Sequence, residues 1–185
     1  YSPYPLAQIT DDIRYQATKS PDGTVSRHGE IEYLAENGFG THWFVGANDA
    51  VWHFVRAGDP ADEPILFVHG YPDTWWSWHE VMAYLADDFY LISVDTLGYG
   101  QSDKRLSLDL SYAGVAEGIE ALMDTIGIEA FNLVGHDRGA VIGDHMVARD
   151  SMDGRILAYL RMQQSADQPH GLPRPPHGQM ASAAF

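Results

Sequence analysis

Residues 132–141 read NLVGHDRGAV and place two glycines around an aspartate, directly after an apolar run. The apolar letters are typical of a buried strand, and the letters that follow, RGAVIGDHMVARD, have the spacing of a helix. Gly135 and Gly139 each lie two positions from Asp137. Glycine is needed there if the turn is so tight that a side chain would collide with the neighbouring strand or helix. The carboxylate of Asp137 would then lie at the start of a helix, where backbone N–H groups and the helix dipole favour an anion.

Two interpretations of this corner compete. The order glycine, any residue, nucleophile, any residue, glycine is that of a nucleophile elbow. A lone G-x-D-x-G is more often a helix N-cap with glycines nearby. We favour a nucleophile at Asp137 because a strand precedes it, a helix follows it, and the motif His69-Gly70-Tyr71-Pro72 follows an earlier strand.

Strand and helix patterns alternate on both sides of the elbow. Short, nearly continuous apolar runs predict strands that helices bury on both faces, and the intervening segments have helical spacing. The predicted strands are ILFVHG (65–70), FYLISVDT (89–96), AFNLVGH (130–136) and RILAYLRM (155–162), and the predicted helices cover 76–86, 111–127 and 138–150. A hairpin of two antiparallel strands, HWFVG and AVWHFVRAG, precedes them. This order is typical of an α/β fold with a mostly parallel sheet and helices on both faces.

Composition and hydrophobic pattern divide the chain into three parts. Residues 1–41 are polar and rich in turns, which predicts an N-terminal extension. Residues 42–164 carry the regular pattern and form the predicted core. Residues 165–185 are rich in proline and are predicted to begin a lid or a linker. A chain of 185 residues, 45% of them apolar, is enough for one domain with a sizeable core.

Charge and composition exclude several classes of function. With 26 acidic and 11 basic residues the net charge is −15, which argues against a nucleic-acid surface because phosphate binding depends on Lys and Arg. The absence of cysteine removes disulfides, thiolate metal sites and a cysteine nucleophile. The first residues do not resemble a signal peptide, and no apolar run approaches the roughly 18 residues of a membrane span. We therefore predict a soluble, cytoplasmic chain with a small neutral molecule as its substrate and no membrane contact.

Three loops follow predicted strands, at the edge of a parallel sheet where ligands bind. They read HGYPDTWWSW, TLGYGQSDK and GHDRG. Together they resemble the α/β-hydrolase superfamily, in the branch with an aspartate nucleophile that contains epoxide hydrolases and haloalkane or haloacetate dehalogenases. His69-Gly70-Tyr71-Pro72 matches the HGxP motif of that branch, and GYGQSD (98–103) matches its G-[YF]-G-x-S element. The likeness extends over residues 42–164 and implies an α/β-hydrolase core without its final strands and without most or all of the lid.

The resemblance implies catalysis through an alkyl ester on Asp137. This aspartate would open an epoxide or expel a halide, and a water molecule activated by a histidine would then hydrolyse the ester. The backbone N–H groups of Tyr71 and Arg138 match the donors of the oxyanion hole. The residues expected to contact the substrate or to support the loops are His69, Gly70, Pro72, Trp75 and His136. Pro72 is also a candidate for a cis peptide bond.

The choice between substrates depends on the loops. WWSW after the HGYP motif favours an epoxide hydrolase. Arg138 is typical of haloacetate dehalogenases, but their second arginine, one helix turn later, is replaced by Ala140-Val141-Ile142. A bidentate grip on a small acid is disfavoured without it. Epoxide opening is therefore the first prediction, and dehalogenation by the same nucleophile is the alternative.

The resemblance implies no cofactor, and we expect no metal either. Asp144 and His145 are adjacent on a predicted helix, so their side chains point in different directions, and no third ligand has a suitable spacing.

A histidine base and an orienting acid should follow the nucleophile in the chain. The strand after the nucleophile helix ends Leu160-Arg161-Met162-Gln163-Gln164, without a carboxylate. His170 and His177 lie in the proline-rich tail and are poor candidates for the base. The chain alone is therefore expected to be incomplete and inactive as a hydrolase.

Three explanations for this gap stay open. The sequence is part of a full-length hydrolase, half of a split enzyme that another chain completes, or a binding protein that keeps the fold without catalysis. In each case RILAYLRM would form an open sheet edge, which predicts self-association or a complementing chain.

Overall fold

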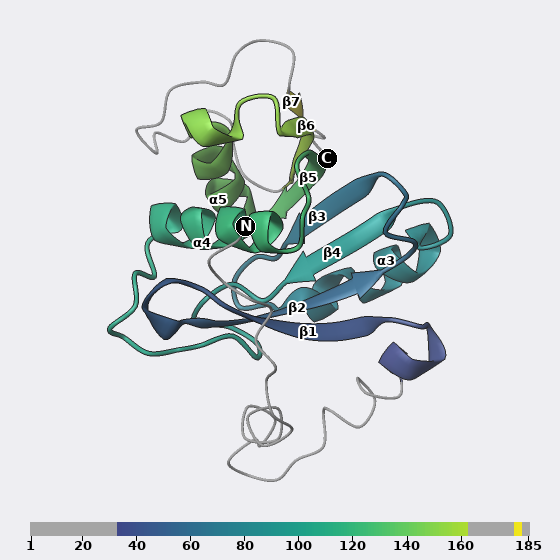
Figure 1. Ribbon diagram of the computed structural model, residues 1–185, viewed down its shortest axis with the longest axis horizontal. Coiled ribbons are helices and arrows are strands. Elements are labelled where there is room, and N and C mark those ends of the chain that lie inside the picture. Colours follow the sequence, from purple (N-terminus) through teal and green to yellow (C-terminus); the bar gives the residue numbers. More distant parts are fainter. Residues whose placement is uncertain (1–32, 163–179, 183–185) are drawn as a thin grey trace, which may run out of the picture.

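The computed structural model describes residues 33–162 and 180–182 of the chain (Figure 1). Its centre is a seven-stranded sheet with the order β1-β2-β4-β3-β5-β6-β7. The strands are β1 (Gly40–Val45), β2 (Val51–Ala57), β3 (Pro64–Val68), β4 (Tyr90–Val94), β5 (Phe131–His136), β6 (Ile156–Met162) and β7 (Met180–Ser182). The pairs β1·β2 and β2·β4 are antiparallel, and every later pair is parallel. The predicted hairpin and the mostly parallel sheet are confirmed.

Three helices follow the strands, each within or close to a segment that the sequence predicts as helical. They are α3 (His79–Leu85), α4 (Tyr112–Thr125) and α5 (Arg138–Val147), and the short 3-10 turns are η1 (Ala47–Asp49), η2 (Trp75–Trp78) and η3 (Asp150–Met152). Helix α4 begins after Ser111, whose hydroxyl accepts a hydrogen bond from the Gly114 amide. It ends before Gly127, which has a φ of 78° that favours glycine. Both ends of this helix are those that the sequence predicts.

The predicted helix at 76–86 is only partly correct. Residues 75–78 form the 3-10 turn η2, and α3 starts at His79. The side chain of Thr74 accepts a hydrogen bond from the Trp76 amide and caps this turn. The apolar spacing extends through both elements, so it does not reveal where one ends and the other begins.

Two apolar layers pack on the two faces of the sheet. One joins β-strand side chains such as Leu66 and Ile92 to α4 and α5 through residues that include Ile119 and Ile142. The other joins the opposite side chains of the same strands to η2 and α3. Figure 1 shows α4 and α5 side by side at the sheet. Helices therefore cover both faces, as predicted for strands with continuous apolar runs.

At the N-terminal side the folded core reaches beyond the boundary placed at residue 42. Strand β1 already begins at Gly40, and Leu34 and Phe39 are buried in the layer that contains η2 and α3. Most of the extension predicted for residues 1–41 lies outside the described residues.

At the C-terminal side the prediction of an open edge along RILAYLRM is wrong in part. Strand β7 pairs parallel with β6 and matches residues 159–161 with residues 180–182. Residues 180–182 are the only described part of the segment predicted to begin a lid or linker, and here they belong to the sheet. The unpaired backbone of a strand edge is a template for another strand, which explains why this segment pairs despite its weak strand pattern.

No helix among the described residues has the length and apolar character needed to cross a bilayer.

Candidate active site

Asp137 occupies a strained corner between β5 and α5. Its backbone has φ 50° and ψ −116°, a region that residues with a side chain rarely adopt. A Cβ added to Gly135 would lie 2.7 Å from the carbonyl oxygen of Gly139, and one added to Gly139 would lie 2.1 Å from that of Val68. The two glycines are therefore needed because helix α5 and strand β3 approach the corner so closely. This is the physical cause that the sequence predicts for the G-x-D-x-G pattern.

The carboxylate of Asp137 is held by the loop that follows β3. The backbone N–H of Tyr71 donates a hydrogen bond of 2.9 Å to Asp137 Oδ1. A Cβ at Gly70 would lie 2.6 Å from the Cβ of Asp137, so the loop backbone passes directly over the nucleophile candidate. Asp137 is partly exposed to solvent. Of its two oxygens, Oδ1 is thus bound to a donor of the expected oxyanion hole.

Arg138, the second expected donor, is the first residue of α5. Its guanidinium lies between two tyrosine rings, with Cζ 5.0 Å from the centroid of Tyr99 and 5.2 Å from that of Tyr112. It donates hydrogen bonds to the Tyr99 hydroxyl and to the carbonyl of Leu110, each at 3.2 Å. Its buried Nε has no hydrogen-bond partner among the described residues. The two tyrosines around it were not anticipated, and Tyr99 of the GYG element is the only one that lies in a motif.

His69 supports the loop from behind and is fully buried. Its Nδ1–H donates to the carbonyl of Gly70 at 2.8 Å, and its Nε2 accepts from the Thr96 amide at 3.0 Å. This pattern requires the neutral imidazole that carries its proton on Nδ1. Burial lowers the pKa of His69 below its usual value and so favours the same form. The peptide bond between Tyr71 and Pro72 is cis, as expected for this motif.

Trp75 and His136 lie around the loop that follows β3. The side chain of Trp75 is 1% exposed and belongs to the layer that contains α3. The ring of His136 packs edge-on against Trp78, with centroids 6.4 Å apart. Its Nδ1 lies 3.0 Å from where a Cβ of Gly70 would be. Both aromatic residues therefore border the loop that carries Tyr71.

The end of β6 carries no carboxylate. Arg161 is buried there and forms an ion pair with Asp144 of α5, with 2.8 Å between Nη2 and Oδ2. His170 and His177 lie outside the described residues. Over the described part of the chain, no group of three or more His, Asp or Glu side chains is arranged to hold a metal ion.

Comparisons with known proteins agree with the fold that carries this site. A family model described as "alpha/beta hydrolase fold" matches residues 63–173. Epoxide hydrolase 4 of Mus musculus is 29% identical over 116 residues, which cover 59% of this chain and 31% of that protein. Fluoroacetate dehalogenase of a Burkholderia species is 37% identical over 93 residues, which cover 48% of this chain and 30% of that protein.

Among solved structures, an epoxide hydrolase from Vigna radiata superposes with a TM-score of 0.61 at 26% identity. The match covers 69% of this chain and 38% of that one. The chain therefore spans about a third of the length of the relatives it matches.

Proposed function

Since the chain belongs to the α/β-hydrolase family, we propose that it opens epoxides through a covalent ester on Asp137. One observation carries this proposal. The Tyr71 amide donates a hydrogen bond of 2.9 Å to Asp137 Oδ1, and we assign the attack to Oδ2. An isolated N-cap would give no reason for a second loop to bring an amide to that carboxylate.

The reaction follows from the two roles of the carboxylate oxygens. Oδ2 attacks a ring carbon, the carbon–oxygen bond of the epoxide breaks, and the released oxygen takes up a proton. Water then gives up a proton to the histidine base and adds to the ester carbonyl, whose oxygen is Oδ1, so the negative charge develops on this oxygen. The Tyr71 amide is already bound to it, so stabilisation of the tetrahedral intermediate needs no rearrangement. Collapse of the intermediate releases the diol and restores the carboxylate.

The two oxyanion donors are proposed to act together. Tyr71 contributes its amide from the HGYP loop, and Arg138 contributes its amide from the start of α5. Loss of one donor of this kind costs about 3–4 kcal/mol of transition-state stabilisation. Two further roles are the proton donor for the ring oxygen and the histidine base. The sequence assigns neither role to a residue of this chain.

The lack of an assigned base makes the first step easier to observe. Ester formation uses the nucleophile and a proton for the ring oxygen, which solvent can supply, whereas ester hydrolysis needs the histidine. We therefore expect the chain, incubated with a styrene-oxide-type epoxide, to gain the mass of one substrate molecule. Intact mass spectrometry measures this gain, and peptide mapping should assign it to Asp137. The Asp137→Ala variant should show no gain, and a wild-type chain that never acquires the added mass contradicts the mechanism.

Dehalogenation by the same nucleophile is the second candidate. It is favoured by the unpartnered Nε of Arg138 and by the similarity to fluoroacetate dehalogenase, since a substrate carboxylate would satisfy that donor. It is disfavoured by Ala140-Val141-Ile142, which offers no second arginine on the next turn. Halide release from a haloacetate, lost in Arg138→Gln while epoxide labelling is kept, would assign the chain to this reaction.

A binding protein without catalysis is the third candidate. It predicts that Asp137→Asn binds the ligand as well as wild type does and that neither protein becomes covalently modified. Isothermal titration beside the mass measurement distinguishes this case from both hydrolytic reactions.

A further inference from the structure

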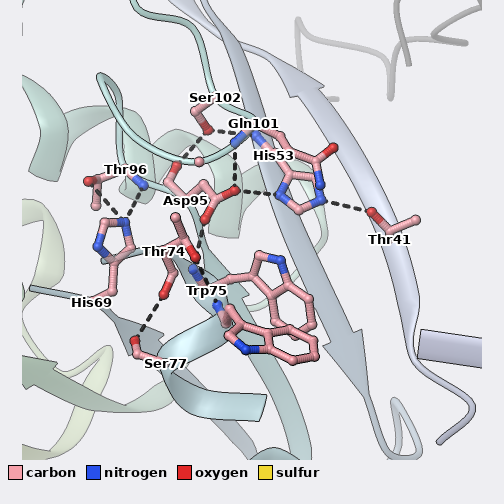
Figure 2. A network of polar contacts seen from close by, with 12 residues as sticks. Thr41, His53, His69, Thr74, Trp75, Ser77, Asp95, Thr96, Gln101 and Ser102 are labelled. Carbon is pink, nitrogen blue, oxygen red and sulfur yellow. Dashed lines mark hydrogen bonds and ion pairs between the residues drawn. The ribbon is translucent and has the colours of Figure 1, made fainter. Parts of the chain in front are cut away.

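The buried carboxylate of Asp95 lies behind the loop that carries Tyr71. Asp95 follows β4, is 0% exposed, and accepts three hydrogen bonds from different parts of the chain (Figure 2). Its donors are His53 Nδ1 at 2.8 Å, the Trp75 amide at 2.7 Å and the Gln101 amide at 2.8 Å. Burial alone would raise the pKa of Asp95, but the hydrogen bonds from His53 and the two amides outweigh it and lower the pKa. Asp95 is therefore a buried anion with several donors and a fixed position.

Asp95 and its neighbour hold both ends of the loop. The carboxylate of Asp95 binds the amide of Trp75, at the end of the loop, while the amide of Thr96 binds the ring of His69, at its start. Tyr71 lies between these two anchor points. Asp95 and Thr96 follow the central strand β4. Together they set the position of the loop whose Tyr71 amide contacts Asp137. Figure 2 draws both anchors, the hydrogen bond from Trp75 to Asp95 and that from Thr96 to His69.

The second carboxylate oxygen of Asp95 fixes the next loop. It accepts from the Gln101 amide, and a Cβ at Gly100 would lie 2.1 Å from it, so the backbone of this loop closes tightly around the carboxylate. The loop carries Tyr99, whose ring contacts the ring of Tyr71 with centroids 6.2 Å apart. The same ring contacts the guanidinium of Arg138. Both residues of the proposed oxyanion hole therefore touch a loop that Asp95 holds.

His53 holds Asp95 in turn. Its Nδ1 donates to the carboxylate, and its Nε2 contacts the hydroxyl of Thr41 on β1 at 2.8 Å. The His53 amide also donates to the hydroxyl of Ser102, which donates to the Asp95 carbonyl. Asp95 is thus tied to the antiparallel hairpin, which contributes no residue to the elbow itself.

We infer that Asp95 and His53 are positioning residues that set the distance from the Tyr71 amide to Asp137 Oδ1. Their effect on ester formation rests on the proposed function, but their effect on the Tyr71 amide does not. Neither residue touches the substrate in this proposal. The hairpin of β1 and β2 extends the sheet. In this proposal it also helps to hold the oxyanion loop, which is the loop after β3 that carries Tyr71.

Four variants of the full chain test this inference. Asp95→Asn replaces one acceptor oxygen by an amino group, so at least one of the three donors loses its partner. His53→Leu removes the donor to Asp95, whereas His53→Asn keeps a donor close to the position of Nδ1. Asp144→Asn is the matched control, because it makes the same chemical change in a carboxylate that pairs with buried Arg161 on another face of α5.

The first measurement follows the Tyr71 amide by proton–nitrogen NMR, with its signal identified through its response to Asp137→Asn. We expect the signal to shift and the amide proton to exchange at least about 10-fold faster in Asp95→Asn and His53→Leu. His53→Asn and Asp144→Asn should stay close to wild type. This readout needs no substrate, so it decides the positioning role even if the chain never forms an ester.

The second measurement is the rate at which the epoxide mass is added to Asp137. Asp95→Asn and His53→Leu should slow it by about 10- to 100-fold, because a Tyr71 amide displaced by about 1 Å no longer holds the attacking carboxylate in its orientation. Recovery in His53→Asn separates positioning from general loss of packing. An unshifted Tyr71 amide in folded Asp95→Asn overturns the inference. If that variant does not fold, equal Tyr71 signals in His53→Leu and His53→Asn overturn it instead.

Discussion

At Asp137 the backbone and the reaction make opposite demands. The proposed reaction requires a carboxylate, whereas a φ of 50° with a ψ of −116° suits glycine. Non-glycine residues in such a region cost on the order of 1–3 kcal/mol. Strain of this kind persists at sites where the surrounding structure imposes it, and here α5, β3 and the HGYP loop all press on the corner.

We therefore predict an unusual order of stability at position 137. Asp137→Gly and Asp137→Ala both remove the hydrogen bond from Tyr71, so they differ mainly in backbone strain. Asp137→Gly should be more stable than Asp137→Ala by about 1–2 kcal/mol. Urea denaturation measures the difference, and neither variant should form an ester. Equal stability, or a more stable alanine variant, would mean that the elbow does not hold a positive φ.

The lowered pKa values of His69 and His42 predict that the folded chain loses stability in mild acid. Burial lowers the pKa of His69 from 6.5, and burial with nearby Arg56 lowers that of His42 to about 4. Between these lowered values and 6.5 the unfolded chain binds more protons than the folded one. The stabilisation from neutral histidine is therefore complete above about pH 6.5 and is lost as the pH falls below it.

The measurement is the urea midpoint at about pH 7.5 and at about pH 5, where most carboxylates stay ionised. We expect a lower midpoint in acid. His42→Gln should reduce this pH dependence without altering the HGYP loop. A midpoint that does not change over this range would show that the buried histidines are not held neutral.

Among single residues, those that make a motif could be predicted and those that make a network could not. Asp137, the two glycines and the HGYP loop stand in short patterns with a steric cause, and the structure supplies that cause. The link between His53 and Asp95 joins residues 42 positions apart on neighbouring strands. No local pattern marks such a pair, because its partners meet only after β2 and β4 align.

Among the elements, α4 shows how a glycine can oppose helix propensity. A Cβ at Gly118 would lie 2.1 Å from the ring of Trp52, which is buried on β2. The glycine allows the helix to pack closely on the sheet at this point. An exposed helix would gain about 1 kcal/mol from alanine at such a position.

Gly118→Ala should therefore destabilise the chain rather than stabilise it, by about 1–3 kcal/mol of overpacking. In a Trp52→Phe background the smaller ring leaves space, and the same substitution should become neutral or stabilising. Thermal and urea denaturation of the four proteins of this double-mutant cycle measure the coupling. Additive effects would contradict a direct contact between α4 and Trp52.

Strands and helices were predictable to the extent that burial leaves a periodic signature. The strands β3, β4, β5 and β6 follow apolar runs, and their predicted ends differ by only a few residues from those observed. The split between η2 and α3 was missed because the apolar spacing continues through both elements and does not mark the boundary at His79. Strand β7 was missed because it depends on pairing with β6 and stands in a proline-rich segment.

At the scale of the whole molecule, the fold and the proposed function depend on different parts of the protein. The family match covers residues 63–173, which contribute to both apolar layers of the sheet, so the assignment of the fold rests on residues that the chain contains. Catalysis also needs a base and an acid, and the chain spans 31% of the length of its epoxide hydrolase relative from mouse. The elbow and its oxyanion loop are thus the part of the proposed mechanism that the described residues can test.

The sheet edge beside β6 predicts self-association of the isolated chain. Strand β7 matches only residues 159–161, so the first residues of β6 have no described strand partner on that side, and Leu157 is 53% exposed there. Unpaired backbone next to an exposed apolar side chain favours pairing with another copy or with a complementing chain.

We expect light scattering after gel filtration to show dimers or larger species whose share rises with concentration. Leu157→Lys should shift the chain towards the monomer, because a charged side chain opposes edge pairing. Leu106→Lys is the matched control, since it places the same charge at an exposed leucine in the loop before α4. A wild-type chain that stays monomeric at high concentration, or equal effects of the two lysines, would mean that this edge is already protected.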